Sequence, residues 1–180
     1  MKRIHFLLLT CLFASTSLAQ SNFSKNFQSK KGNFTFTYPS YLSAQKIENA
    51  SHMLLKLDSD NHALSLSLWD YGFDSSVSVW DDEIVSFYKQ SDANYPNAKI
   101  ITSCDKVNLN IANNKKVKCL KTELYVSNTV QGYTLKQKIT IYRFVHKGNY
   151  LQFMFFVMNY HDYWDKSPFT DEIIKGLTLD

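Results

Sequence analysis

Large apolar side chains recur at every second position in several short stretches of the chain, which is the pattern of β-strands with one buried face. Phe34–Tyr38 alternates with threonine, Leu64–Leu68 alternates with serine, and Met53–Leu57 has the same period. Further strands are predicted, between Asn, Gly or Asp turn residues, at 99–103, 107–111, 116–126, 133–146 and 149–158. We therefore expect an antiparallel sheet of about six to eight strands.

The last of these strands differs from the others in its pattern. Asn149–Asn159 is apolar on both alternating faces, rather than on one face only. A strand with a solvated face keeps polar residues on that face, whereas a strand covered on both sides does not. This segment is therefore predicted to be a central strand with cover on each side.

Two segments have helical signals. The first helix is predicted to begin at Ser78 as the N-cap residue, because the acids at 81–83 suit the positive end of the helix dipole. Its apolar face is expected to carry Trp80, Ile84, Phe87 and Tyr88. The second helix follows Ser167–Pro168, since proline is favoured at the first helical position. Its stripe is expected to carry Phe169, Ile173 and Leu177, with Gly176 just past its end.

The N-terminus has the composition of a secretory signal peptide over residues 1–19. Lys2 and Arg3 precede an apolar run at 4–14, and Ser17–Ala19 supplies a small-x-small cleavage site. A lipoprotein reading at Cys11 is disfavoured, because Thr10 is larger than the residue that usually precedes such a cysteine. We expect export through the Sec pathway to the periplasm or beyond, and no integral membrane segment after cleavage, since no later apolar run reaches ~20 residues.

Cleavage would leave 180 − 19 = 161 residues, the size of one ordinary domain. We expect 20–31 to be a flexible lead-in and 32–180 to form a single domain. Loss of Lys2 and Arg3 lowers Lys+Arg from 20 to 18 against 16 acids, so the mature net charge is +2 and Arg143 is the only arginine left. That composition argues against a nucleic-acid partner. Four clustered lysines, Lys115, Lys116, Lys118 and Lys121, are expected to keep a sheet edge soluble rather than to form an anion site.

Cys104 and Cys119 remain after cleavage, and an even number of cysteines in an oxidising compartment suggests a disulfide. If Asn113–Asn114 is a two-residue turn, paired positions sum to 227, which sets Cys119 opposite Asn108. The cysteines are then ~13 Å out of register, whereas bridged Cα atoms lie ~4.4 to 6.8 Å apart. A disulfide is expected only if the strand bends near 105–106, and two free thiols are the alternative.

The order of these features resembles the PsbP-like superfamily, named for an extrinsic photosystem II subunit and including a Ran-binding nuclear import factor. The resemblance rests on the strand ending in Tyr38–Ser40, the hairpin, a capped helix, the long antiparallel strands and the closing segment FTDEIIKGLTL. It implies an α+β fold in which an antiparallel sheet is sandwiched between helices, and a non-enzymatic accessory or binding role. It transfers no functional residue to a numbered position.

Known catalytic motifs are missing from the sequence. The five glycines, at 32, 72, 132, 148 and 176, permit neither a P-loop nor a dinucleotide fingerprint, and no G-x-S-x-G, H-E-x-x-H or C-x-x-C occurs. Asp58, Asp60 and His62 alternate as metal ligands could, but turn residues are the plainer explanation. His161 beside Asp162 could form a hydrolytic dyad, although adjacent residues seldom orient one another. We therefore expect that the protein is not an enzyme and that it binds neither a metal ion nor a cofactor.

The expected function is that of a binding or assembly accessory protein of the cell envelope, with another envelope protein as its partner and a monomer or weak oligomer as its state. The alternative is a small-ligand carrier or a hydrolase with a pocket between sheet and helices. Aromatic residues in two loops are the binding candidates, since such residues dominate binding hot spots. They are Trp69, Tyr71 and Phe73 in one loop, and Tyr160, His161, Tyr163 and Trp164 in the other. The two loops form a shared rim if their strands end at the same edge of the sheet, and otherwise the rings cover the ends of the core.

Overall fold

The computed structural model describes residues 23–29, 33–47, 51–60, 63–72, 78–158 and 169–180. The predicted signal peptide lies outside these ranges. The described residues form two antiparallel sheets, helix α1 (Asp82–Ala93), the short helix α3 (Phe169–Ile174) and a 3₁₀ turn (Ala112–Asn114).

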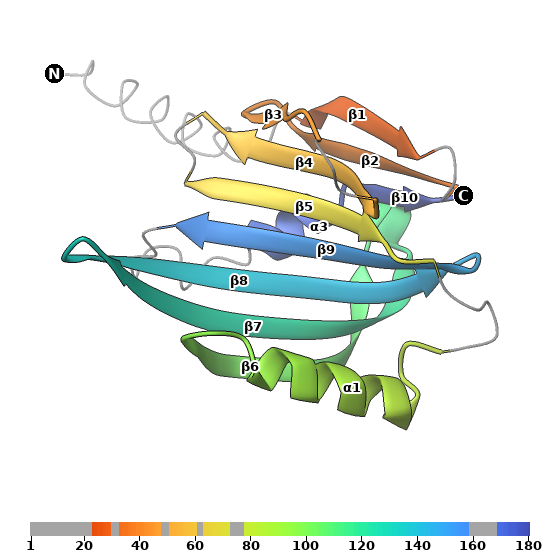
Figure 1. The fold of residues 1–180 in the computed structure, drawn as a ribbon. Coiled ribbons are helices and arrows are strands. Elements are labelled where there is room, and N and C mark those ends of the chain that lie inside the picture. The colour runs from red at the N-terminus through yellow and green to blue at the C-terminus, as the bar shows by residue number, and fades with distance from the viewer. Residues whose placement is uncertain (1–22, 30–32, 48–50, 61–62, 73–77, 159–168) are drawn as a thin grey trace, which may run out of the picture.

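The larger sheet has seven strands in the order β3-β4-β5-β9-β8-β7-β6, all antiparallel (Figure 1). Their bounds are β3 (Leu42–Ala44), β4 (Met53–Ser59), β5 (Leu64–Asp70), β6 (Ala98–Asn110), β7 (Lys116–Val130), β8 (Tyr133–His146) and β9 (Asn149–Met158). After β5 the chain passes through α1 to the far edge, and β6 to β9 then return strand by strand until β9 pairs with β5. The prediction of β9 as the central strand is confirmed, since three strands flank it on either side.

The smaller sheet consists of β1 (Phe23–Ser29), β2 (Phe34–Pro39) and β10 (Leu177–Leu179), with β2 in the middle. It packs against one face of the larger sheet, where Phe36 meets Phe153 edge-on at a centroid distance of 5.2 Å. The main core lies in this interface, and Ile173 and Ile174 of α3 close it. We call this side of the larger sheet the inner face and the opposite side the outer face.

This architecture corrects the expectation of a sheet sandwiched between helices. The inner face is covered chiefly by a second sheet, and α1 covers only part of the outer face (Figure 1). Three strands were not predicted: β1, β3 and β10. β1 lies within the segment 20–31 that we expected to be flexible, and β10 occupies the end of the predicted second helix, so Leu177 is a strand residue. β1 has few apolar side chains, and β3 and β10 have only three residues each, so none of them gives a clear periodic signal.

The first helix also differs from its prediction. It begins three residues later than a Ser78 cap implies, with Asp81 at the N-cap position, and the Ser78 N–H instead donates to the Asp81 carboxylate at 3.0 Å. Phe87, which we expected on the buried face, has an exposed fraction of 61%, whereas Val85 is buried. The other predicted residues of that face, Trp80, Ile84 and Tyr88, do pack against the sheet.

A buried ion pair fixes α1 to the sheet. Asp92, in the last turn of α1, receives two bonds from the Arg143 guanidinium of β8, at 2.6 and 2.9 Å, and both residues are 3% exposed. Thr122 donates its hydroxyl to the same carboxylate at 2.7 Å, and Arg143 Nε donates to Gln152 at 3.0 Å. Burial lowers the pKa of Arg143, but the hydrogen bonds and charge of Asp92 outweigh that effect, and the net shift is upward. Arg143 therefore stays charged beneath the helix.

We predict that Asp92→Ala lowers the free energy of unfolding by about 3–5 kcal/mol, because it leaves a buried guanidinium without its counter-ion. Asp82→Ala, on the same helix, breaks only the exposed contact with Lys106 and should cost no more than about 1 kcal/mol. Urea unfolding followed by circular dichroism measures both values. Equal losses in the two variants would contradict the anchoring role of Asp92.

Candidate functional site

The outer face carries an apolar surface that α1 leaves uncovered. Directly opposed residues of antiparallel strands point to the same face, and Trp69 of β5 pairs with Met53 of β4 on one side and with Gln152 of β9 on the other. Gln152 in turn faces Arg143, beneath α1. Met53, Trp69, Gln152 and Arg143 therefore all lie on the outer face. The helix covers the Arg143 end of this row, and Met53 and Trp69 lie at the other end.

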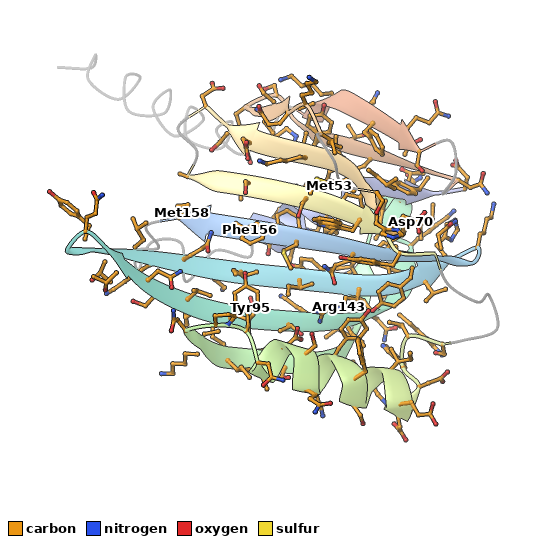
Figure 2. All side chains as sticks on the ribbon, in the orientation of Figure 1. Met53, Asp70, Tyr95, Arg143, Phe156 and Met158 are labelled. Atoms are coloured by element: carbon orange, nitrogen blue, oxygen red, sulfur yellow. The ribbon has the colours of Figure 1, made fainter. Side chains whose placement is uncertain are left out.

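Two further residue rows extend this surface along β9. Met154 lies between Ser67 of β5 and Ile141 of β8. Phe156 lies in the same way between Ser65 and Ile139, and Met158 faces Gln137. We name the set Met53, Trp69, Met154, Phe156 and Met158 the methionine face. All five side chains are half-buried, and Figure 2 shows Met53, Phe156 and Met158 on the front of the sheet.

The methionine face packs against a buried apolar cluster and lies beside small polar residues. Met154 and Phe156 pack on a buried cluster formed by Leu124, Val126, Ile139 and Ile141. On β5 their cross-strand neighbours are the small residues Ser67 and Ser65. Methionine is the most adaptable apolar side chain, and methionine-rich surfaces are typical of sites that accept varied apolar partners. The arrangement can therefore bind apolar groups, and its described residues offer no nucleophile with an orienting base.

An aromatic row borders the methionine face at one end. Trp69 and Tyr71 lie parallel with their ring centroids 6.1 Å apart, and His52 lies 5.7 Å from Tyr71. Tyr71 then contacts Tyr150, which stacks on Tyr88 of α1 at 5.6 Å. Tyr71 has an exposed fraction of 42%, so its ring is accessible. Trp69 is half-buried, because its indole N–H donates to the Ser67 hydroxyl at 2.9 Å and holds the ring against the sheet.

The shared aromatic rim is nevertheless wrong. β5 and β9 are antiparallel neighbours, with Asp70 opposite Leu151 and Leu64 opposite Val157. The segments that follow these two strands therefore leave the sheet at opposite ends. Sequence pattern alone does not reveal which strands become neighbours, and the rim depended on that. The remaining candidates lie outside the described residues: Phe73, Tyr160, His161, Tyr163 and Trp164.

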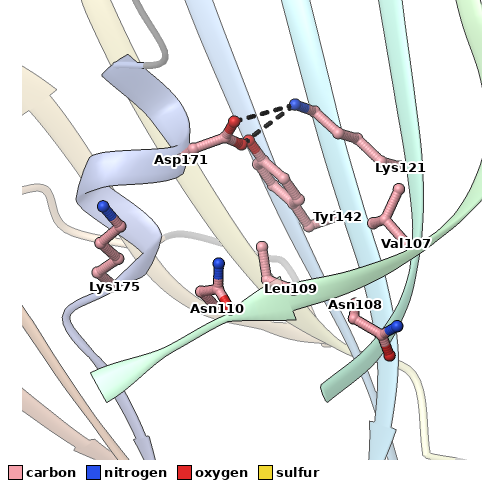
Figure 3. A pocket seen from close by; sticks show the side chains of 8 residues that line it. All are labelled: Val107, Asn108, Leu109, Asn110, Lys121, Tyr142, Asp171 and Lys175. Atoms are coloured by element: carbon pink, nitrogen blue, oxygen red, sulfur yellow. Dashed lines mark hydrogen bonds and ion pairs between the residues drawn. The ribbon is translucent and has the colours of Figure 1, made fainter. Parts of the chain in front are cut away.

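A small polar pocket lies on the inner face beside α3 (Figure 3). Its volume is about 200 Å³, and its charged lining includes Lys121, Asp171 and Lys175. Lys121 contacts Asp171 at 3.1 Å, and the Tyr142 hydroxyl donates to the same carboxylate. Burial, and after it the charge of Asp171, raise the pKa of Tyr142, so its hydroxyl remains a donor. These groups satisfy one another and tie α3 to the sheet.

The lysine cluster of the sequence is therefore not merely a soluble edge. Lys121 is half-buried in the ion pair just described, and Lys118 lies over the Trp80 ring at 5.1 Å from the centroid. Lys115 donates to the carbonyl of Leu179 at 3.4 Å. Lys116 is exposed.

The disulfide between Cys104 and Cys119 is not formed. Both are free thiols, and they belong to different cores, Cys119 on the inner face and Cys104 beneath α1 on the outer face. The β6–β7 turn contains three residues rather than two, so paired positions near it sum to 226, as in Val107 opposite Cys119. A one-residue change in register exchanges the faces of a strand. Cys104 itself lies in an irregular stretch of β6, between Thr102 and Asp105, and has φ = 49°.

The other candidate chemistry stays untested or without support. In the ranges that the structure describes, no group of three or more His, Cys, Asp or Glu side chains is placed to hold a metal ion. Asp58 lies in β4 and Asp60 in the turn after it, while His62 and the His161–Asp162 pair fall outside these ranges. No helix within them is long and apolar enough to cross a membrane.

Comparison with known proteins adds a likeness of fold. No family model and no curated protein matches the sequence. A protein of Bacteroides thetaiotaomicron VPI-5482 matches with a TM-score of 0.52 at 11% identity, over 88% of this chain and 49% of its own. This chain therefore spans about half the length of that protein. LpqN, described as involved in cell envelope biogenesis of Mycobacterium tuberculosis, aligns with a TM-score of 0.47 at 10% identity over 86% and 88% of the two chains.

The sequence indicated Trp69 of the methionine face, and Tyr71 beside it, but not the other four residues of that face. The signal was present in β9, whose second apolar set was interpreted as covered core. The second missed feature is the Asp92–Arg143 pair. A lone arginine in a predicted strand, flanked by Tyr142 and Phe144, could have indicated a buried ion pair, because a guanidinium in such surroundings needs a partner.

We predict that both cysteines resist alkylation in the folded protein and react fully once it is unfolded without reductant. Burial raises the pKa of the Cys119 thiol to about 12, and burial also raises the pKa of Cys104, so neither thiol ionises near pH 8. Mass spectrometry after iodoacetamide treatment in urea should detect two adducts on exported protein. Absence of adducts until a reductant is added would contradict this assignment.

Proposed function

We propose that this protein is an exported, non-catalytic accessory protein of the cell envelope that binds an apolar segment of another envelope protein on its methionine face. We also propose that it is a member of the PsbP-like superfamily. The order of elements supports that assignment, since β2 ends at Pro39, a hairpin follows, α1 precedes the long strands, and α3 with β10 closes the chain.

One observation carries the proposal: the methionine face holds all three methionines that follow Met1, together with Phe156 and Trp69. Half-buried apolar side chains of this size on a sheet face would gain burial from a partner, at roughly 25 cal/mol for each Å² of apolar surface removed from water. Flexible thioethers fit a partner's leucine or phenylalanine side chains without a preformed socket. The surface therefore suits an apolar polypeptide segment, in the manner of a helix lying on an apolar groove.

A small-ligand site is the weaker candidate. Small-molecule pockets generally enclose ~300 Å³ or more and are mostly apolar. The pocket beside α3 holds about 200 Å³, and its charged groups already have partners: Lys121 pairs with Asp171, and Lys175 pairs with Glu172 outside the pocket. These contacts hold α3 against the sheet and leave few groups that could bind a ligand. Export is supported by the N-terminal sequence, where a basic start, an apolar run and a small-x-small site follow in order.

The test uses the methionines as their own reporters. The mature protein, labelled with ¹³C at the methionine methyl groups, is titrated with a synthetic amphipathic helix of leucine and glutamate residues, and NMR follows Met53, Met154 and Met158. We expect the three signals to shift together and to saturate. Phe156→Asp should weaken binding at least tenfold, because it places a charge at the centre of the contact. Phe87→Asp, the same change on exposed α1, should leave binding unchanged.

Circular dichroism establishes that the variants are folded, and Met158→Glu, nearer the end of β9, replaces Phe156→Asp if that variant unfolds. Unmoved methyl signals at saturating peptide would refute the proposal. Equal weakening by the Phe87 variant would do so as well, since it would place the contact elsewhere.

A further inference from the structure

The hairpin of β7 and β8 extends past the rest of the sheet. β6 begins opposite Val126, and β9 ends opposite Gln137. Residues 127–130 and 133–136 therefore pair only with each other among the described strands, as the protruding end of the hairpin in Figure 1 shows. We call residues 127–136 the ribbon. Its described side chains are all exposed, and Tyr133 reaches an exposed fraction of 77%.

The ribbon presents backbone groups that no described strand uses. In an antiparallel pair, alternate residues direct both N–H and C=O away from the partner strand. Ser127 is such a residue, because its N–H donates outward to the carbonyl of Asn97 at 3.4 Å. Lys136 lies opposite Ser127, and Thr129 and Thr134 form the next such pair. The alternation therefore places the N–H and C=O of Thr134 on the outer edge of β8.

The true edge strand β6 is protected in ways that the ribbon is not. β6 carries two bulges and the charged residues Lys99, Asp105 and Lys106, which are common devices against edge-to-edge pairing. The ribbon pairs without a register shift, and residues 127–135 include neither a charge nor a proline. An isolated two-stranded hairpin is only marginally stable in water, so pairing at its edge would stabilise it.

A second copy of this chain is the occupant that the charges favour. Across a two-fold axis each residue near the axis meets its own counterpart, so any charge there faces a like charge. The chain has a positive net charge, but residues 127–135 include no charged residue. This stretch also has outward backbone groups that no described strand uses. An antiparallel contact of Thr134 with its counterpart meets no electrostatic penalty.

We propose that the protein forms a weak homodimer in which the β8 edges of two ribbons pair antiparallel around a two-fold axis near Thr134. That axis stands perpendicular to the sheets, which become continuous, with both methionine faces on the same side. Tyr133 and Leu135, which are exposed in the single copy, gain cross-strand neighbours in the dimer. This inference is independent of what the methionine face binds.

Sedimentation equilibrium of the mature protein, from low to high micromolar concentration and without any ligand, tests the dimer. We expect a reversible monomer–dimer equilibrium that Thr134→Lys weakens at least tenfold, because it sets two like charges across the axis. Asn108→Lys, the same added charge on exposed β6, should leave the dissociation constant unchanged.

Thr134→Cys supplies a second readout, since the two natural cysteines are buried. Mild oxidation should give a disulfide-linked dimer, whereas Asn108→Cys should stay monomeric under the same conditions. A monomer at every concentration would overturn the proposal, as would a dimer that ignores Thr134→Lys. A third outcome would also overturn the proposal. If the wild type forms no dimer and Thr134→Lys no longer binds an envelope partner, the edge pairs with a strand of another protein.

Discussion

The placement of α1 depends on one buried ion pair, and much of the outer surface follows from it. Two opposite charges that are only 3% exposed are stable when they bond each other directly and when further hydrogen bonds pair their remaining donors and acceptors. Asp92 meets this condition through Arg143 and Thr122, and Arg143 through Gln152 and the ring of Tyr88 at 4.2 Å. These partners lie on α1, β7, β8 and β9, and together they fix α1 against the sheet beside β6. In the part of the chain that the structure describes, no helix covers the half of the outer face toward β4 and β5.

The individual strands were largely predictable, because alternation is a local signal. β4, β5, β8 and β9 lie where the pattern placed them, and β2 runs into Pro39 as expected. Register was less predictable. The 3₁₀ turn at Ala112–Asn114 differs from a two-residue turn by one residue, and that is sufficient to move Cys119 to the face opposite Cys104. The neighbours of a strand were not predictable at all, since the pairing of β5 with β9 joins segments about ninety residues apart.

The candidate site was recoverable only in part for a related reason. β9 has apolar residues on both faces, and such a pattern is expected of a covered strand but also of a strand with one face reserved for a partner. Phe153 and Phe155 are buried in the interface of the two sheets, whereas Met154 and Phe156 remain half-buried on the other side. The types of apolar residue on the two faces of β9 distinguish these two cases. The buried face of β9 carries phenylalanine, leucine and valine, and the outer face carries both of its methionines.

The closure of both sheets near the C-terminus has a consequence for the order of folding. Phe36 of β2 pairs with Leu177, and β5 acquires its second neighbour only when β9 has been made. The larger sheet is therefore incomplete until β9 has been made, and the smaller sheet until β10 at 177–179 has been made. Earlier segments can form only local pairs such as β1 with β2 and β4 with β5, and loop-closure entropy delays the rest. If the chain is exported N-terminus first, as we propose, the topology would delay completion of the fold until most of the chain had crossed.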